Sequence, residues 1–460
     1  MEEIVVFTVT MYSKGGKSIF DNLCELNKET FIQFVPSEDS VCKTIHSLKS
    51  RGMFIEASSE VGITCSCSKG HFENIFATKV TKSKVKGIQE GEYFTYETED
   101  EIDIPTWLEC VEKITMPRQM FVLDERIQPQ LPYFHYTLPK GIQQVAKKEL
   151  LDKCMFDRKE RKVGIIDTGL YRHDYFEKNS YEFSVDSAVS FFDSNKDEKG
   201  HGTGMSAVLL ALLDKSKITM IKASNLNWSY PVAALQQASK YNFDVLNCSW
   251  GIIGFEPQAY LEIANLINKG TIVVFSCGNG ATDRKKSFLQ TIAYPDVISV
   301  GGCMVHMDGT IEVSDISSSY DSDLFENRHA PDLCGICGKM PYAQIILMPI
   351  QPAALFDFEN GKRDGTAQDD GWFVSSGTSA AAAYVSGIVA NILEASLIQK
   401  EDVSEFLINS CKKVSEGKNF MGEVASGREY DLATGSGFLD FESVLSNLDY
   451  SKTKGDINEV

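Results

Sequence analysis

Four polar residues in this 460-residue sequence stand in short motifs that could support nucleophilic catalysis. They are Asp167 in "IIDTG", His201 in "KGHGTG", Asn279 in "SCGNG" and Ser379 in "SGTSAAAA". A serine hydroxyl becomes a nucleophile when an imidazole takes its proton, and a carboxylate can hold that imidazole in one tautomer. A side-chain amide can stabilise the oxyanion that forms next. Together these residue types suffice for acyl transfer.

Each motif also has an ordinary structural interpretation. Asp-Thr-Gly is a common turn, and Asn279 between Gly278 and Gly280 could simply occupy a left-handed turn. Ser379 precedes a run of alanines and a long apolar helix, so it could be a capping residue. At that position its backbone N–H also lies where the helix dipole favours negative charge. Each motif alone leaves both interpretations open.

The segments around these motifs predict how the four side chains are positioned. From about residue 141 the sequence alternates amphipathic helices with Val- and Ile-rich runs: "KVGIIDTG", "KITMIKAS", "FDVLNCSWG", "GTIVVFSCGNG" and "DVISVGG". Such runs are typical of parallel strands that are buried on both faces. The alternation predicts an α/β fold with a doubly wound, mostly parallel sheet. Ligands of this fold gather beyond the carboxyl ends of the strands, where the motifs stand.

The first 130 residues predict a separate, small α+β domain. Strand-like segments such as "EEIVVFTVTMY", "FIQFVP", "MFIEASS" and "GITCSCS" are interspersed with helical ones such as "SVCKTIHSLKSRG". Residues 131–140 are expected to form an extended linker because of their prolines. Residues 141–450 then form the larger domain. The polar residues 451–460 are expected to be a flexible tail.

Composition and charge exclude several classes of function. A net charge of −19 argues against a nucleic-acid partner, because phosphate binding needs clustered Lys and Arg. No apolar run is long enough to predict a membrane span. The N-terminus carries two acids where a secretion signal needs basic residues, so we expect a cytoplasmic protein. The twelve cysteines are then reduced thiols, and pairs such as Cys65 with Cys67 or Cys334 with Cys337 supply too few ligands for zinc. We predict no metal ligands.

The chain order Asp, His, Asn, Ser resembles that of the subtilisin family of serine proteases, the subtilases. "DTG", "HGTG", "CGN" and "GTSAA" are similar to the family's signatures, and "YPDVISVGG", "HAPDLCG" and "YDLATGSGFLDFESVL" resemble further family segments. The resemblance covers roughly residues 135–446. It implies a subtilisin-like fold in which Asp167, His201 and Ser379 are catalytic and Asn279 binds the oxyanion.

The resemblance also implies where a substrate binds and what happens to it. "VLNCSWG" is similar to the family strand that pairs with the substrate, which assigns substrate binding to Ser249, Trp250 and Gly251. The implied function is a serine endopeptidase that acts through an acyl-enzyme on a restricted peptide or protein in the cytosol. The alternative is a catalytically silent scaffold that only binds. No cofactor is required. Structural calcium is frequent in the family, but no ligand set stands out here.

The N-terminal domain resembles subtilase propeptides, which assist folding and then block the active site. This implies that it acts as an intramolecular inhibitor or chaperone. Alignment of "GIQQV" with the start of the mature family domain places a self-cleavage junction near Phe134 and His135, in "QLPYFHYTL". If the domain is retained instead, we expect a regulatory or substrate-recruiting module.

Several positions depart from the family pattern. Ala380 and Ala383 stand where Met and Pro are usual, and Gly204 stands where a second His is common. Residues 355–373 lengthen the approach to Ser379 and are either a substrate-facing lid or exosite or a loop without a role. Glu256 either meets a basic substrate side chain or is an ordinary surface acid.

Overall fold

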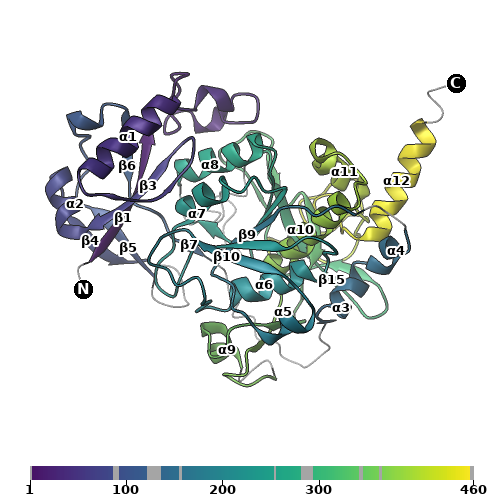
Figure 1. Cartoon of the computed structure of the whole chain (residues 1–460). Helices are drawn as coiled ribbons and strands as arrows, with labels where there is room; N and C mark the ends of the chain where they lie inside the picture. Colours follow the sequence, from purple (N-terminus) through teal and green to yellow (C-terminus); the bar gives the residue numbers. More distant parts are fainter. Residues whose placement is uncertain are drawn as a thin grey trace.

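The larger domain is built on one twisted sheet (Figure 1). The computed structural model describes residues 3–85, 93–121, 136–154, 158–252, 255–280, 294–340, 345–361 and 365–455. The strand order is β10-β11-β9-β12-β14-β15-β16, and β19 also pairs with β15. The strands are β9 (Val163–Asp167), β10 (Phe183–Ser187), β11 (Ile218–Lys222), β12 (Val245–Cys248), β14 (Ile272–Ser276), β15 (Ile298–Val305), β16 (Ile311–Val313) and β19 (Leu333–Ile336). All of these pairs are parallel except β15 with β16, so the predicted fold class is confirmed.

Helices cover both faces of this sheet. One buried cluster joins the sheet to α6 (His201–Leu210) and α10 (Thr378–Glu394), and a second joins it to α7 (Pro231–Ala238) and α8 (Pro257–Asn268). Ile165 belongs to the first cluster and Ile166 to the second. Since successive strand residues point to opposite faces, a strand between two helical layers must be apolar throughout. None of the helices in the described ranges is long and apolar enough to cross a membrane.

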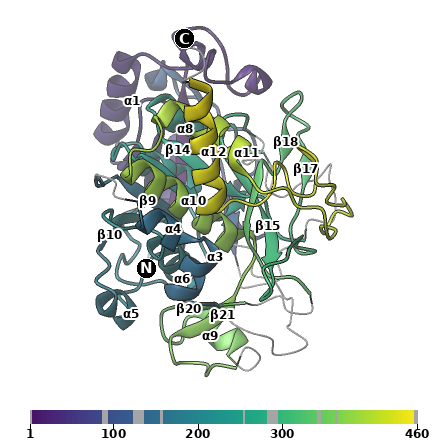
Figure 2. The same cartoon turned by 90° about the vertical axis from the view of Figure 1, so that its right-hand side faces the viewer.

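Smaller elements complete the larger domain. They are α3 (Lys140–Val145), α4 (Lys148–Asp152), α5 (Asp174–Lys178), α9 (Leu355–Asn360), α11 (Val403–Ser410), α12 (Phe441–Gly455), β8 (Tyr136–Thr137), β13 (Gly251–Ile252), β17 (Tyr320–Asp321), β18 (His329–Ala330), β20 (Ile346–Pro349) and β21 (Trp372–Ser375). Strands β21, β20 and β8 form a small sheet, and β17 pairs with β18. Figure 2 shows α9, β20 and β21 together at one end of the domain.

The N-terminal domain is an antiparallel sheet with helices on one face. Its strands, in the order β2-β3-β1-β6, are β2 (Phe54–Ser58), β3 (Ile63–Ser68), β1 (Ile4–Met11) and β6 (Val111–Thr115). The helices are α1 (Glu38–Ser50) and α2 (Lys69–Phe76), and β4 (Val80–Lys84) with β5 (Phe94–Thr98) forms a hairpin. Phe7 of β1 packs on Phe72 and Phe76 of α2. Its neighbour Val6 belongs to the core shared with the larger domain, so β1 is buried on both faces.

The other face of this small sheet packs on α7 and α8 (Figure 1). Thr10 Oγ1 of β1 donates a hydrogen bond to Gln258 Oε1 of α8 at 2.7 Å, and Gln258 Nε2 donates to the carbonyl oxygen of Val61 at 3.1 Å. Past β6, the two-residue strand β7 (Met120–Phe121) pairs antiparallel with β13 of the larger domain. The N-terminal domain is therefore attached through both its sheet and an extended arm, residues 116–121, which ends in β7.

Three segments differ from the sequence-based expectations. "FIQFVP" is not a strand but contains the 3-10 helix η2 (Phe31–Gln33), because the buried Phe31 and Phe34 are spaced for a helical turn. In the expected linker, residues 131–135 lie outside the described residues, whereas β8 and the start of α3 belong to the larger domain. Helix α12 continues to Gly455, into the expected tail, because its buried first turns nucleate a helix that is then easy to extend.

Candidate functional site

Asp167 and His201 are joined by a buried hydrogen bond. Asp167 is the last residue of β9 and is 0% exposed, and His201 is the first residue of α6. His201 Nδ1 lies 2.7 Å from Asp167 Oδ1, which also accepts the Thr168 backbone N–H at 2.7 Å. An Nδ1–H that points at the carboxylate leaves Nε2 as the basic nitrogen. This geometry is that of an oriented general base, and Asp167 is more than a turn residue.

A second buried carboxylate, Asp197, supports the turn that carries His201. Asp197 Oδ1 accepts bonds from Thr168 Oγ1 at 2.7 Å and from the Gly200 backbone N–H at 3.0 Å. Its Oδ2 accepts from Thr203 N at 2.8 Å and Thr203 Oγ1 at 2.7 Å. Burial raises the pKa of Asp197, and the bonds from Thr168 and Thr203 oppose that shift. The sequence analysis missed this residue, although an acid four positions before His201 was a visible signal.

Ser379 lies at the start of α10 without capping it. The capping position is Gly377, at φ 92°, and no side chain caps the helix, so the capping interpretation of Ser379 is wrong. Ser379 Oγ donates to the carbonyl oxygen of Ser249 at 3.2 Å, and Ser249 Oγ donates to the Ser379 carbonyl oxygen at 2.9 Å. Among the described side chains, no hydrogen bond joins Ser379 to His201. In this state the hydroxyl is held by Ser249.

Two neighbouring serines are committed to other partners. Ser376 Oγ accepts the backbone N–H of Gly338, and Ser386 Oγ donates to Asn247 Oδ1 at 3.0 Å inside the core. Ser375 is the last residue of β21. Ser379 is therefore the serine of this motif that lies at the helix N-terminus, where unpaired backbone N–H groups favour an anion.

The amide of Asn279 is fixed beside the start of α10. Asn279 Oδ1 accepts the backbone N–H of Thr378 at 2.8 Å and its Oγ1–H at 2.7 Å. Only the oxygen can accept these bonds, so Nδ2 is left as a donor. A Cβ on Gly377 would lie 2.8 Å from Nδ2, so glycine keeps this donor uncovered. Positive φ falls on Gly278 and Gly280 and not on Asn279, so the left-handed interpretation of Asn279 is wrong.

The departures from the family pattern have local explanations. A Cβ on Gly204 would lie 3.1 Å from Met348 Sδ, so Met348 of β20 fills the space that a second histidine would need. Ala380 and Ala383 are fully buried in α10, which runs without interruption from Thr378 to Glu394. The helix start does not depend on a proline.

Residues 249–251, which were expected to bind a substrate strand, lie where strand β7 of the N-terminal domain pairs with the larger domain. Ser249 follows β12, and the buried Trp250 packs on Phe275 with ring centroids 5.2 Å apart. Gly251 lies opposite Phe121 in the pairing of β13 with β7. The expected junction at Phe134 and His135 lies outside the described residues.

Residues 355–373 approach His201, as far as the structure describes them. The Phe356 ring of α9 meets the His201 ring edge to face at 6.2 Å between centroids. Phe356 also packs on Phe373 at 5.6 Å. Residues 362–364 lie outside the described ranges. Part of this stretch therefore forms a wall beside the imidazole.

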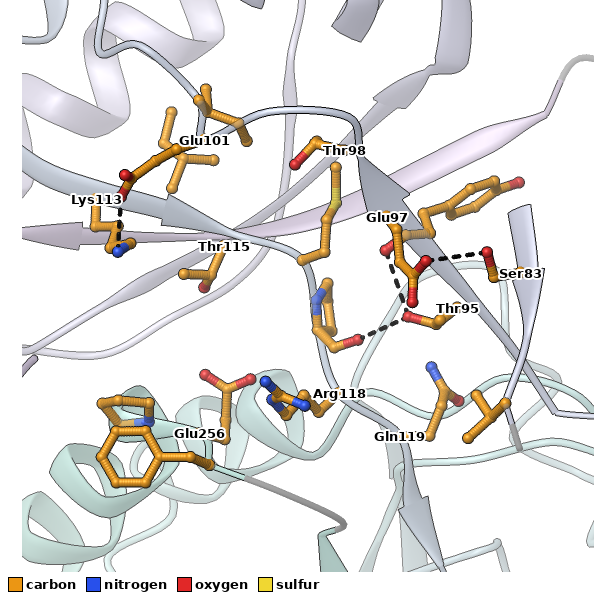
Figure 3. A pocket seen from close by; sticks show the side chains of 18 of the residues that line it. Ser83, Thr95, Glu97, Thr98, Glu101, Lys113, Thr115, Arg118, Gln119 and Glu256 are labelled. Atoms are coloured by element: carbon orange, nitrogen blue, oxygen red, sulfur yellow. Dashed lines mark hydrogen bonds and ion pairs between the residues drawn. The ribbon is translucent and has the colours of Figure 1, made fainter. Parts of the chain in front are cut away.

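Glu256 is not a surface acid. It lies just before α8, is 4% exposed, and borders a pocket between the two domains (Figure 3). Burial raises the pKa of its carboxyl group to about 7, and the neighbouring Arg118 opposes that shift. The basic side chain beside it comes from the N-terminal domain.

Metal ligands do not gather in the described part of the chain. No group of three or more His, Cys, Asp or Glu side chains there could hold an ion. All twelve cysteines are free thiols.

Comparison with known proteins places this geometry in a family. Residues 158–427 match the Subtilase family of peptidases. Over 158 residues the chain is 25% identical to the minor extracellular protease Epr of Bacillus subtilis. This alignment covers 31% of this chain and 23% of Epr. The family match spans more than half of the chain, which therefore belongs to the subtilase family, as the sequence motifs indicated.

Two solved structures share the fold. Fervidolysin from Fervidobacterium pennivorans, a keratinolytic enzyme related to subtilisin, superposes with a TM-score of 0.58 at 15% identity, over 97% of this chain and 61% of its own. The epidermin leader peptide processing serine protease from Staphylococcus aureus superposes with a TM-score of 0.56 at 16% identity, over 98% of this chain and 99% of its own. This chain spans about a quarter of the length of Epr and about three fifths of fervidolysin.

Proposed function

We propose that the protein is a serine endopeptidase with Asp167, His201 and Ser379 as its catalytic triad. Ser379 Oγ attacks a peptide carbonyl carbon while His201 Nε2 takes the hydroxyl proton. The imidazolium then gives that proton to the leaving amine, which breaks the peptide bond and leaves an acyl-enzyme. Water, activated by the same imidazole, hydrolyses the ester. Asp167 keeps the imidazole in the required tautomer throughout.

The oxyanion of each tetrahedral intermediate is stabilised by two donors. One is Nδ2 of Asn279, whose direction is set by the bonds from Thr378 to Oδ1. The other is the backbone N–H of Ser379 at the start of α10. Donors that are fixed before the reaction need no reorganisation when the charge develops.

The N-terminal domain acts in this proposal as an intramolecular inhibitor. Strand β7 pairs with β13, directly beside Ser249, where a substrate strand would pair. A substrate must displace this arm, or the arm must be cut. The alternative roles, a chaperone or a recruiting module, use the same contacts and are distinguished by what happens to the domain on activation.

The buried Asp167–His201 hydrogen bond carries the proposal, because it turns a histidine at a helix start into an oriented base. The test is labelling of the intact protein with a fluorophosphonate, which reacts only with an activated serine. We expect one adduct, on Ser379, that disappears in Ser379→Ala and persists in Ser376→Ala. A folded wild-type protein that stays unlabelled even after limited proteolysis has cut the inhibitory arm would instead support the silent scaffold.

The substrate of this endopeptidase is proposed to be a restricted peptide or protein. The arm occupies the position where a substrate strand would pair, so a substrate must bind there more tightly than the arm does. Few peptides meet this condition, which favours a dedicated maturation protease over a general degradative one. Action in the cytoplasm stays a prediction from the sequence. Intact masses of wild type beside Ser379→Ala report self-cleavage and show whether a cut lies near residues 134 and 135 or nearer to Phe121.

A further inference from the structure

The arm of the N-terminal domain is held by a side-chain contact that strand pairing does not require. Ser229 donates two hydrogen bonds to the carboxamide oxygen of Gln119, from its backbone N–H at 2.8 Å and from Oγ at 3.0 Å. Ser229 Oγ also accepts the Met120 backbone N–H at 2.7 Å. Ser229 is 0% exposed and Gln119 is 4% exposed. A single serine thus binds both the backbone and a specific side chain of the arm.

The direction of the arm places this contact upstream of the site of cleavage. Met120 lies opposite Ile252 and Phe121 opposite Gly251, so each later residue of the arm lies opposite an earlier residue of the larger domain. Ser249, whose carbonyl oxygen lies 3.2 Å from Ser379 Oγ, stands two positions before Gly251. Any peptide that adopts this register approaches Ser379 in the N-to-C direction. The residue in the place of Gln119 then precedes the residue opposite Ser249 by four positions.

The residues around Gln119 restrict what can replace it. The Met120 side chain next to it belongs to the same buried apolar cluster as Tyr230 and Trp250. Gln119 and Glu256 border the same pocket, as Figure 3 shows. An apolar side chain in the place of Gln119 would leave the buried Ser229 N–H without an acceptor, which is unfavourable. A carboxylate would accept the bonds but would add another acid to a pocket that Glu97, Glu101 and Glu256 already line.

We propose that Ser229 is a specificity-determining residue that selects substrates with a glutamine at the position that Gln119 occupies, followed directly by an apolar residue. This inference rests on the proposed endopeptidase function and names its substrate class. The substrate carries a neutral carboxamide side chain, four residues before the residue whose carbonyl is attacked. The arm of the N-terminal domain is the internal copy of that sequence.

The test compares three peptides that differ only at this position. Each carries Arg, the test residue, Met and Phe in the order of residues 118–121, followed by two fixed residues and a fluorogenic reporter. The test residue is glutamine, leucine or glutamate. The full-length protein is used, because competition from its own arm is the same for all peptides and cancels in the ratio of kcat/KM values. We expect kcat/KM to be at least about tenfold higher for glutamine than for either of the others.

The variant Ser229→Ala tests the residue itself. It removes the hydroxyl and keeps the backbone N–H, so we expect the glutamine-to-leucine ratio to fall to about threefold or less. The matched control is Ser239→Ala, which removes a buried serine just after α7 whose hydroxyl donates to the carbonyl oxygen of Gln236 in the same helix at 2.9 Å. It should keep the full ratio. Equal rates for glutamine and leucine, or an unchanged ratio in Ser229→Ala, would overturn the inference.

A binding measurement separates this inference from the proposed function. The same peptides, labelled with a fluorophore instead of the reporter, are titrated into Ser379→Ala and followed by anisotropy. Cleavage of none of the peptides by wild type would count against the endopeptidase. Tighter binding of the glutamine peptide than the leucine peptide would still support the role of Ser229. Equal binding of the two would overturn it.

Discussion

The ammonium group of Lys199 lies 4.0 Å from the centre of the Tyr93 ring. Lys199 also donates hydrogen bonds to the Tyr93 hydroxyl and to Ser224 Oγ, the latter at 3.1 Å. Because Lys199 stands two positions before His201 and is buried, this contact ties the N-terminal domain to the loop that carries the proposed base. The domain thus touches the site at two places, here and at β13.

This contact predicts how the N-terminal domain is released. Tyr93→Ala removes the ring and the hydroxyl, so we expect weaker docking and a severalfold rise in the initial rate on a short peptide substrate. Tyr93→Phe keeps the cation–π contact and loses only the hydroxyl, so its rise should be smaller. The measurement is the initial rate of freshly purified full-length protein, before any self-cleavage. Equal rates in all three proteins would show that the contact does not limit access.

Docking of the N-terminal domain should also weaken as the pH rises. Glu262 of α8 is buried under the small sheet, where Gln236 and Gln258 donate to its Oε1. Burial raises the pKa of the Glu262 carboxyl group from its ordinary 4.5 to about 7, and the nearby Glu60 acts in the same direction. Undocking exposes this carboxyl group to water and returns its pKa toward the ordinary value.

The sign follows from which state holds the proton. The docked state binds the proton more tightly, so its extra stability is fully present below about pH 4.5 and is lost as the pH rises to about 7. Above that value the effect is constant. The protection factors of residues 59–68 in Ser379→Ala, in which the intrinsic pH dependence of amide exchange is divided out, should therefore fall by about tenfold or more across this window. Glu262→Gln, which stays neutral, should weaken this dependence, and the double variant with Glu256→Gln should remove most of it, because burial raises the pKa of both carboxyl groups to about 7. Glu60→Gln should retain it.

The order of the motifs along the chain predicted which residues form the site, because each motif occupies a defined position in the fold. Each of the four residues ends or follows a strand or lies in the first turn of a helix, and parallel strands bring such positions to one edge. They are Asp167, His201, Asn279 and Ser379. The pairing of Asp167 with His201 is observed as expected. Their catalytic roles remain the proposal that labelling tests.

The remainder depends on packing that no local pattern reveals. Asp197 matters because four donors from three separate positions converge on it, which becomes visible only in the folded chain. Glu256 looked like a surface acid because nothing in the sequence places the N-terminal domain over α8. The spacing of Phe31 and Phe34 did contain the signal for a helical turn, but the apolar run around them favoured a strand.

Asp197 is predicted to be a positioning residue for His201. Asp197→Asn keeps the shape but replaces one accepting oxygen with an NH₂ group that faces donors, which should cost roughly 1–3 kcal/mol of stability. We expect kcat to fall about tenfold or more with little change in KM, because the loop shifts and the substrate strand does not. The pH profile of kcat should shift as well, since the environment of the imidazole changes. An unchanged pH profile with reduced stability alone would mark Asp197 as purely structural.

Thr378 is predicted to act through Asn279. Thr378 Oγ1 donates to Asn279 Oδ1 and accepts the backbone N–H of Gly278 at 3.0 Å, so it locks the amide against rotation. Thr378→Val preserves the shape and removes both bonds. We expect kcat to fall about tenfold, and about 100- to 1,000-fold in Asn279→Ala, where the donor itself is lost.

The double variant decides whether the two residues form one unit. If Thr378 serves only to orient the amide, Thr378→Val adds nothing once Asn279 is alanine, and the double variant has the kcat of Asn279→Ala. If the fold reductions in kcat of the two single variants multiply in the double variant, Thr378 contributes independently of Asn279, for instance through the start of α10. Ser386→Ala is a suitable reference, since it removes a buried hydroxyl from the same helix with a different partner, Asn247.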